Sequence, residues 1–402
     1  MKKPSYMTID GIPVEIEGEK NILELIRKAG IKLPTFCYHS ELSVYGACRM
    51  CMVEGVGGRL DAACSAQPRP GMDIRTNTER LRRYRKMILE LILANHCRDC
   101  TTCQSSKNCK LQDLAARFRI EGVRFPGPGA AARAGRDDSS PCVAKDSSKC
   151  ILCGDCVRMC NEVQNVGAID FAYRGSKMAI STAFGEPLAQ SGCVGCGQCA
   201  AVCPTGAIAV KNDSARLWGD LSSPDVKVTA QIAPAVRVAV GREFGLAGQE
   251  LGHAGLAENA FGQIVAALRR MGFDEVYDTA TGADLTVLEE SSELLRRLEG
   301  GSGKVDKESA VDKAGGGGGV GKEGGGCGED GKGGESDRNG GSDGGGEPEY
   351  PLFTSCCPAW VSFCEKKHPE LVPHLSTCRS PMQMLASVVK EHHAAASARR
   401  SA

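Results

Sequence analysis

Two stretches of the same form, CILCGDCVRMC at residues 150–160 and CVGCGQCAAVCP at residues 193–204, decide how this chain folds. In each stretch two residues separate the first cysteine from the second and the second from the third, and three residues separate the third from the fourth. This spacing is typical of two [4Fe-4S] clusters in which the fourth cysteine of each run binds the other cluster. Two zinc sites are the alternative, because Cys-x2-Cys also binds zinc, but zinc has no use for the third close cysteine.

The predicted two-cluster domain covers residues 140–212 and is similar to bacterial ferredoxins with two clusters. Each set of three close cysteines is completed by the fourth cysteine of the other run. The first predicted ligand set is Cys150, Cys153, Cys156 and Cys203, and the second is Cys193, Cys196, Cys199 and Cys160. The apolar run 207–210, after Pro204, predicts a strand that closes the domain.

The overall composition narrows the possible partners. The chain has 402 residues with 49 basic and 49 acidic side chains, so its charge favours neither nucleic acid nor an anionic membrane. Its 22 cysteines are spaced as metal ligands and no signal peptide is evident, so we expect a reducing compartment, either the cytoplasm or a reducing organelle. No apolar run has the length of a membrane span, and we expect a soluble or peripheral protein.

The N-terminal segment, residues 1–78, has the pattern of a small domain with strands and a helix. Alternation on either side of Asp10-Gly11 predicts a β-hairpin over 6–17, and apolar residues at helical spacing predict a helix over 21–29. A cysteine loop follows, as at the start of a β-grasp ferredoxin. Its four thiolates suffice for one [2Fe-2S] cluster, and they are Cys37, Cys48, Cys51 and Cys64.

A further metal-binding segment is predicted at residues 79–124. A helix over 78–95 should turn its apolar residues to the core, and these are Leu81, Met87, Ile88, Leu91 and Ile92. Its basic residues should face solvent, and these are Arg80, Arg82, Arg83, Arg85 and Lys86. The helix leads to a possible zinc or [4Fe-4S] ligand set, His96, Cys100, Cys103 and Cys109. A neutral histidine in place of a thiolate would change the charge and potential of a cluster.

The order of these segments resembles the N-terminal half of three related proteins. They are the large iron–sulfur subunit of respiratory complex I, some formate dehydrogenases and the larger [FeFe]-hydrogenases. The resemblance implies that His96 and its three cysteines hold a [4Fe-4S] cluster. The first half would then carry one [2Fe-2S] and three [4Fe-4S] clusters, which form a relay for electrons.

After residue 225 the composition becomes that of an α/β enzyme domain, and we assign residues 225–402 to it. Strands are predicted at 226–232 and 275–277, with helices that begin at 235 and cover 264–271. Residues 300–347 are rich in glycine and charge and poor in apolar side chains. This insert is expected to be disordered, because it cannot bury enough surface to offset its ordering entropy.

The stretch FTSCCPAWV at 353–361 resembles the first active-site signature of [FeFe]-hydrogenases. Residues 232–237, 282–290 and 380–385 resemble segments that surround that site, and complex I subunits lack the Cys-Cys signature. The resemblance implies a multidomain α+β protein of the multi-cluster hydrogenase type, catalysing 2H⁺ + 2e⁻ ⇌ H2 at a diiron plus [4Fe-4S] H-cluster. It also implies ferredoxin or a flavin-containing, NAD(P)H-oxidising subunit as electron partner.

The same resemblance assigns roles to individual residues of this domain. Cys357 would be one of four thiolates on the cubane of the H-cluster, and Cys356 would pass protons beside the diiron half. The proton relay would be Glu290, Glu293 and Ser376, and the pocket wall would be Ala233, Pro234 and Ala235. The two glutamates are three residues apart, so they share a helix face, which is also the pattern of an ordinary solvated face.

The second and third hydrogenase signatures, of which the second is Met-Pro-Cys-x-x-Lys, are absent from the 402 residues. Cys357 is then the one expected thiolate of the H-cluster cubane, so we expect the chain as given to be C-terminally truncated and inactive, with an error in the gene model as the favoured cause. Two alternatives stay open. One is a non-catalytic electron-transfer subunit, and the other is an iron–sulfur subunit of the complex I or formate dehydrogenase type.

Overall fold

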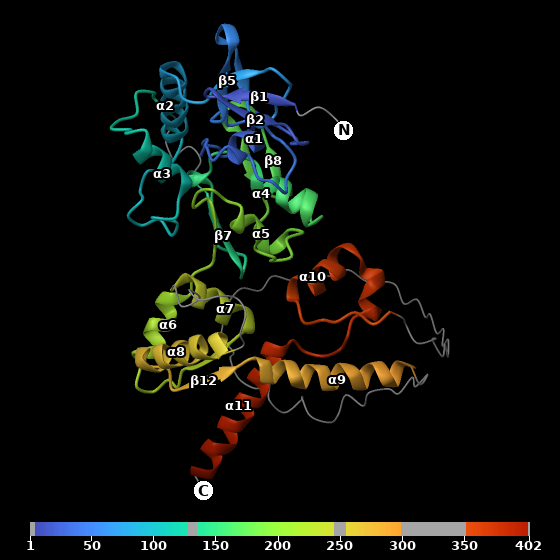
Figure 1. Ribbon diagram of the computed structural model, residues 1–402. Helices are drawn as coiled ribbons and strands as arrows, with labels where there is room; N and C mark the ends of the chain where they lie inside the picture. The colour runs from blue at the N-terminus through green and yellow to red at the C-terminus, as the bar shows by residue number, and fades with distance from the viewer. Residues whose placement is uncertain (1–4, 128–134, 245–254, 299–350, 401–402) are drawn as a thin grey trace, which may run out of the picture. The chain divides into compact units, whose positions relative to one another are not determined.

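The computed structural model describes residues 5–127, 135–244, 255–298 and 351–400 (Figure 1). The chain forms two compact units, Met1–Gly219 and Asp220–Ala402, which we describe separately. The glycine-rich insert predicted at 300–347 lies outside the described residues. Among the described residues, no helix is both long and apolar enough to cross a membrane.

The first unit begins with a five-stranded sheet of order β2-β1-β5-β3-β4. Its strands are β1 (Tyr6–Ile9), β2 (Ile12–Glu15), β3 (Met52–Gly55), β4 (Leu60–Ala62) and β5 (Asp73–Arg75). The predicted hairpin is confirmed: β1 and β2 are antiparallel, and Asp10 and Gly11 both have positive φ, as a two-residue hairpin turn requires.

The predicted first helix is confirmed as α1 (Ile22–Lys28). The Asn21 side chain caps it by accepting a hydrogen bond from the Glu24 N–H at 3.1 Å. Four apolar residues of α1 are fully buried against the sheet, and the core that they complete is made by Met7, Ile9, Ile22, Leu23, Leu25, Ile26, Val53 and Ile74. This core holds the loops that carry the first four predicted ligands.

Helix α2 (Glu79–Ala94) is present as predicted, with Thr78 as its N-cap, but two expectations about its faces are wrong. Arg85 is buried, because its guanidinium donates to the carbonyl oxygens of Met50, Met52 and Thr76 at 2.7–3.1 Å. Met87 and Leu91, predicted to face the core, are each 45% exposed. The core-facing side of α2 is centred instead on Leu81, Arg85 and Leu89, and α3 (Lys110–Arg117) follows the cysteine loop.

The rest of the first unit has the internal repeat that the cysteine runs predict. Its strands are β6 (Arg136–Asp137), β7 (Val143–Asp146), β8 (Asp170–Ala172), β9 (Ala179–Ser181) and β10 (Ile208–Val210). Helix α4 (Asp155–Arg158) continues into a π-helix (Met159–Val163), and its counterpart in the second repeat is α5 (Gln198–Ala201). Gly154 and Gly197 precede the two helices with φ of 75° and 74°, a conformation that a side chain would strain.

The second unit holds a parallel strand pair, β11 (Thr229–Ile232) and β12 (Glu275–Asp278), joined through two helices. The predicted strands and helices are confirmed, although the helix predicted at 264–271 is the second half of a longer one. The helices are α7 (Pro234–Glu243), α8 (Gly255–Met271), α9 (Ala280–Leu298), α10 (Pro358–Lys367) and α11 (Pro381–Arg400), and α6 (Ser214–Leu221) includes the boundary between the units. Helices α9 and α11 pack against each other (Figure 1).

Candidate functional site

The four cysteines predicted to bind a [2Fe-2S] cluster lie close together in the first unit. The Cys48 N–H donates to Cys37 Sγ at 3.3 Å, and the Phe36 N–H donates to Cys48 Sγ at 3.4 Å. Hydrogen bonding between the Cys37 and Cys48 thiols raises the pKa of Cys37 and lowers that of Cys48. Cys51 and Cys64 form a second such pair, in which the pKa of Cys51 is lowered and that of Cys64 is raised. The fold therefore gathers these four sulfurs, as cluster ligation requires.

The imidazole of the predicted ligand His96 is buried, and neither of its ring nitrogens has a hydrogen-bond partner among the described residues. Burial lowers the pKa of His96 and so favours the neutral imidazole, the form that binds metals. An unpaired buried nitrogen costs free energy unless a ligand occupies it.

Two of the three cysteines predicted to accompany His96 share a cavity with it, and the third, Cys103, lies close to Cys100. Cys100 and Cys109 line, together with His96, a cavity of about 250 Å³. Burial, followed by the nearby Cys109 and Cys103 thiols, raises the pKa of Cys100. Cys103 lies against Gly206 of the two-cluster segment, where an added Cβ would stand 2.8 Å from its sulfur. The residues present therefore fit a ligand set of one histidine and three cysteines.

The two cysteine runs separate into the two sets that their spacing predicts. One cavity, of about 20 Å³, is lined by Cys150, Cys153, Cys156 and Cys203. A second, of about 30 Å³, is lined by Cys160, Cys193, Cys196 and Cys199. Ile208 of β10 lines both cavities and so stands between the two sets. Each cavity thus receives three cysteines from one run and one from the other.

Backbone N–H groups point at the sulfurs of both sets. Leu152 donates to Cys150 at 3.4 Å, and Ala168 donates to Cys160 at 3.4 Å. Burial raises the pKa of Cys199 to about 12. Within the described ranges, no three His, Cys, Asp or Glu side chains converge as closely as a single metal ion needs. A cluster places its own irons and sulfides between its thiolates, so its ligands stand farther apart.

In the second unit, the cysteines of the described residues have different surroundings. Cys356 and Cys357 are exposed, at the start of α10. Cys364 is completely buried within α10, and Cys378 is half-buried beside Glu293. The described residues of this unit therefore show no cavity shared by four thiols, and we derive no chemical step through a cluster there.

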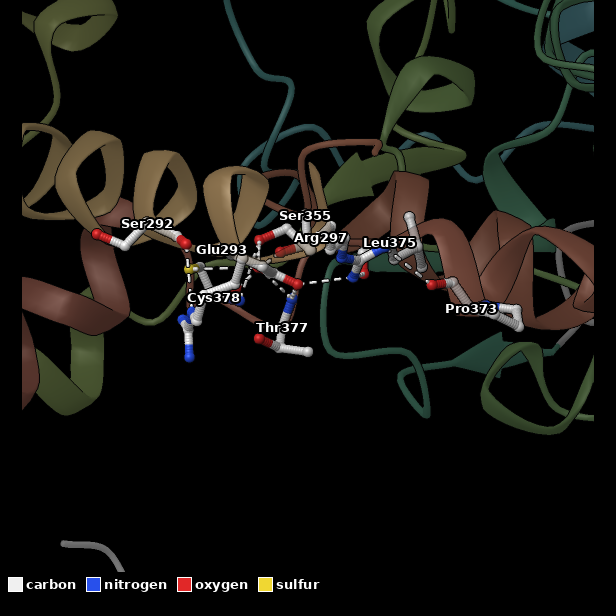
Figure 2. Close-up of polar contacts among 10 residues, drawn as sticks. Ser292, Glu293, Arg297, Ser355, Pro373, Leu375, Thr377 and Cys378 are labelled. Atoms are coloured by element: carbon white, nitrogen blue, oxygen red, sulfur yellow. Dashed lines mark hydrogen bonds and ion pairs between the residues drawn. The ribbon is translucent and has the colours of Figure 1, made fainter. Parts of the chain in front are cut away.

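Glu293 of α9 is the centre of a buried polar network in this unit (Figure 2). Its carboxylate accepts from Ser376 Oγ at 2.8 Å, from Arg297 Nη2 at 2.6 Å and from the Thr377 N–H at 3.1 Å. Burial acts to raise the pKa of Glu293, but the hydrogen bonds from Ser376 and Arg297 outweigh it and lower the pKa. Glu293 and Ser376, two members of the predicted relay, are thus in direct contact.

The third predicted member, Glu290, lies one helical turn before Glu293. Its Oε1 atom is buried without a hydrogen-bond partner in the described part of the chain. Two contacts of the network were not predicted from the sequence. One is Arg297, which could have been predicted because it follows Glu293 by four residues, the spacing of an ion pair on a helix. The other is Cys378, whose Sγ is 3.8 Å from Glu293 Oε2.

The three residues predicted to form a pocket wall lie where β11 leads into α7. Ala233 is half-buried, whereas Pro234 and Ala235 are exposed. None of these three residues carries a polar side chain, so they could contribute to the shape of a pocket but could not donate or accept a hydrogen bond through a side chain. Their role stays a prediction.

Four family models match this chain. Residues 3–79 match a 2Fe-2S iron–sulfur cluster binding domain, and residues 85–124 match the NADH-ubiquinone oxidoreductase-G iron–sulfur binding region. Residues 149–207 match a 4Fe-4S dicluster domain. Residues 226–307 and 344–401 match the C-terminal domain of the iron-only hydrogenase large subunit. Together these matches describe a multidomain protein with iron–sulfur binding domains in its first half and a hydrogenase-like domain in its second.

Curated relatives make the class more specific. The chain is 35% identical to the NADP-reducing hydrogenase subunit HndD of Solidesulfovibrio fructosivorans over 96% of its own length and 59% of that protein. It is 27% identical to iron hydrogenase 1 of Clostridium pasteurianum over 96% of its length and 58% of that protein. The alpha subunit of the NADPH-Fe(3+) oxidoreductase of Geobacter sulfurreducens is 35% identical over 55% of this chain and 26% of that protein. The chain is an iron-only-hydrogenase-like, multi-cluster protein, and it spans somewhat under 60% of the hydrogenase relatives.

Proposed function

We propose that this chain relays electrons through one [2Fe-2S] and three [4Fe-4S] clusters to a hydrogenase domain that interconverts protons and H2. The grouping of the eight cysteines of residues 150–203 around two separate cavities is the observation that carries the relay. The hydrogenase half rests on the family match over residues 226–307 and 344–401. The proposed reaction is 2H⁺ + 2e⁻ ⇌ H2.

The proposed electron partner is a flavin-containing subunit that oxidises NAD(P)H, with ferredoxin as the other candidate. The similarity to a subunit of an NADP-reducing hydrogenase supports the first partner. Either would deliver electrons to the N-terminal clusters.

A count of iron and sulfide tests the relay. Protein reconstituted with iron and sulfide in the absence of oxygen should hold about 14 irons per chain, because one [2Fe-2S] cluster contains two irons and each of the three cubanes contains four. We expect His96→Ala to lower the count by about four, while His39→Ala, a histidine outside the predicted ligand sets, leaves it unchanged. Stoichiometric zinc with little iron or sulfide would contradict the proposal.

The hydrogenase half is tested by two neighbouring cysteines in the product of the whole gene, matured by the hydrogenase maturation machinery. Cys356→Ser should keep all iron yet lose nearly all H2 evolution, because a hydroxyl gives up a proton far less readily than a thiol. Cys357→Ser should instead lose iron, because a neutral hydroxyl is a poor ligand for iron. Equal iron loss in both variants would show that the two residues do not divide their roles.

A second candidate function is electron transfer without catalysis. The exposure of Cys356 and Cys357 at the start of α10 favours it, because the proposed cluster ligand and proton carrier would both need a site that excludes water. Full iron content in the first unit, with no H2 evolved by the matured whole-gene product, would support this second function.

A further inference from the structure

The loop between Cys37 and Cys48 is docked on the helix that carries two ligands of the paired clusters. Arg158 stands in that helix, between Cys156 and Cys160, and is 7% exposed. Its Nη2 atom donates to the Cys37 carbonyl oxygen at 3.1 Å, and its Nη1 atom donates to the Ser43 carbonyl oxygen. One guanidinium therefore joins a predicted [2Fe-2S] ligand to the helix of a predicted cubane.

The guanidinium is itself held in place from its own helix. Asp155, which is also buried, accepts from Arg158 Nη2 in an ion pair. The Arg158 guanidinium lies over the ring of Tyr45 from the docked loop, 5.6 Å from its centroid. Buried charges are stable only when paired and hydrogen-bonded. Here the carboxylate and two carbonyls accept from the Nη atoms, while the buried Nε has no hydrogen-bond partner among the described residues.

Further contacts join the same loop to the two-cluster segment. Tyr45 stacks on Phe171, with ring centroids 5.6 Å apart. Both rings lie close to Gly154, since a Cβ there would stand 2.9 Å from Phe171 and 3.4 Å from Tyr45. Glu162 accepts from the backbone N–H of Ser43 at 3.0 Å and from its hydroxyl. The ten residues between Cys37 and Cys48 thus make a docking contact in addition to a metal-binding turn.

We propose that Arg158, held by Asp155, is a positioning residue that sets the separation of the [2Fe-2S] cluster and the cubane of Cys150, Cys153, Cys156 and Cys203. In the proposed relay one electron would pass from the reduced [2Fe-2S] cluster to the oxidised cubane, and the rate of such a transfer falls steeply with distance. Lysine could not replace arginine, because one ammonium cannot donate in fixed directions to two carbonyls and a carboxylate. The inference rests on the cluster content of the proposed function, and not on its hydrogen chemistry.

The test compares two substitutions of Arg158 with a matched surface substitution. Arg158→Lys keeps the charge and loses the planar fork, and Arg158→Met keeps much of the volume and loses the charge. Arg174→Met is the control, since Arg174 is an exposed arginine of the same segment. A reduced flavin generated by a flash of light supplies the electron, and freeze-quenched samples follow the two clusters by electron paramagnetic resonance.

We expect all three variants to keep their iron, and Arg158→Lys and Arg174→Met to keep the midpoint potential of each cluster as well, because both leave the buried charges near the clusters unchanged. Transfer from the [2Fe-2S] cluster to the cubane should slow several-fold in both Arg158 variants, because the rate of electron transfer falls steeply as the two clusters move apart. The magnetic interaction between the two reduced clusters should weaken in parallel. Arg174→Met should leave both measurements unchanged.

Unchanged transfer and unchanged magnetic interaction in an iron-replete Arg158→Lys protein would overturn the inference. If Arg158→Met fails to hold its clusters, the Arg158→Lys protein, which keeps the charge, still tests whether Arg158 sets the separation of the two clusters. Failure of the proposed function is a separate outcome, because it would be seen as wild-type protein without iron–sulfur clusters. Absence of H2 chemistry in the second unit would leave the measurement unaffected.

Discussion

At the scale of single residues, the same chemical group has different roles according to what surrounds it. Glu290 and Glu293 are three positions apart on α9, and nothing in the sequence pattern separates them. Glu293 is fully bonded to Ser376, Arg297 and the backbone of Thr377, whereas one oxygen of Glu290 is buried without a hydrogen-bond partner among the described residues. The first is therefore an anion held by three donors, whereas the second has a buried oxygen that no such donor reaches in the described part of the chain.

This difference makes a prediction about acid stability. Because the folded pKa of Glu293 lies below its unfolded value, its stabilisation is complete above about pH 4.3 and is lost as the pH falls through the lower, folded pKa. Glu293→Gln should destabilise the contact between α9 and residues 375–378 by about 1–3 kcal/mol at pH 7 and flatten the acid dependence. Hydrogen exchange in peptides of α9, corrected for intrinsic rates, measures both effects.

Glu289→Gln is the control for this experiment, since Glu289 is exposed on the same helix. An acid dependence that is equal in wild-type protein and in Glu293→Gln would contradict the assigned charge of Glu293.

At the scale of elements, helix α2 shows how a charged residue can be part of a core. Arg85 has the place that a leucine would occupy between Leu81 and Leu89. Its guanidinium donates hydrogen bonds to the backbone carbonyl oxygens of Met50, Met52 and Thr76. These residues belong to segments that flank the loops of the predicted [2Fe-2S] ligands. The helix thereby holds the segment that carries Cys51 in position relative to the start of the next cluster segment.

We expect Arg85→Met to lower the free energy of unfolding of the first unit by at least about 3 kcal/mol, because three buried carbonyls lose a charged donor. Arg83→Met on the same helix should change it by about 0.5 kcal/mol or less, since the Arg83–Glu79 pair is exposed. Urea unfolding, followed by the visible absorption of the reconstituted clusters, measures the difference. Similar small changes in both variants would show that Arg85 does not support the fold.

At the scale of the whole molecule, the two units differ in the secondary structure that positions their candidate functional residues. In the first unit the predicted ligands come from loops between short strands and helices. Long-range backbone hydrogen bonds join its segments, and in one of them the Lys110 N–H donates to the Pro204 carbonyl oxygen. Cys97 likewise donates through its backbone N–H to the carbonyl of Ser148. The described part of the second unit is instead a parallel strand pair with longer helices, and its polar centre is Glu293.

The sequence by itself predicted the ligand sets, and it determined most of the helices and strands that carry them. Cluster-binding cysteines follow a local spacing, because three thiolates on one short loop must reach three irons, and hairpins and caps such as Asp10-Gly11 and Thr78 are local as well. The tertiary structure alone decided the burial of Arg85 and the docking of Arg158 on the Cys37 loop, and it put Glu293 and Ser376, which the resemblance had grouped, in direct contact. The contacts from Arg85 to Met50, from Arg158 to Cys37 and from Ser376 to Glu293 join groups 35 to 121 residues apart. Polar periodicity cannot predict them, because a charged side chain is buried only where distant segments bring it enough acceptors or donors.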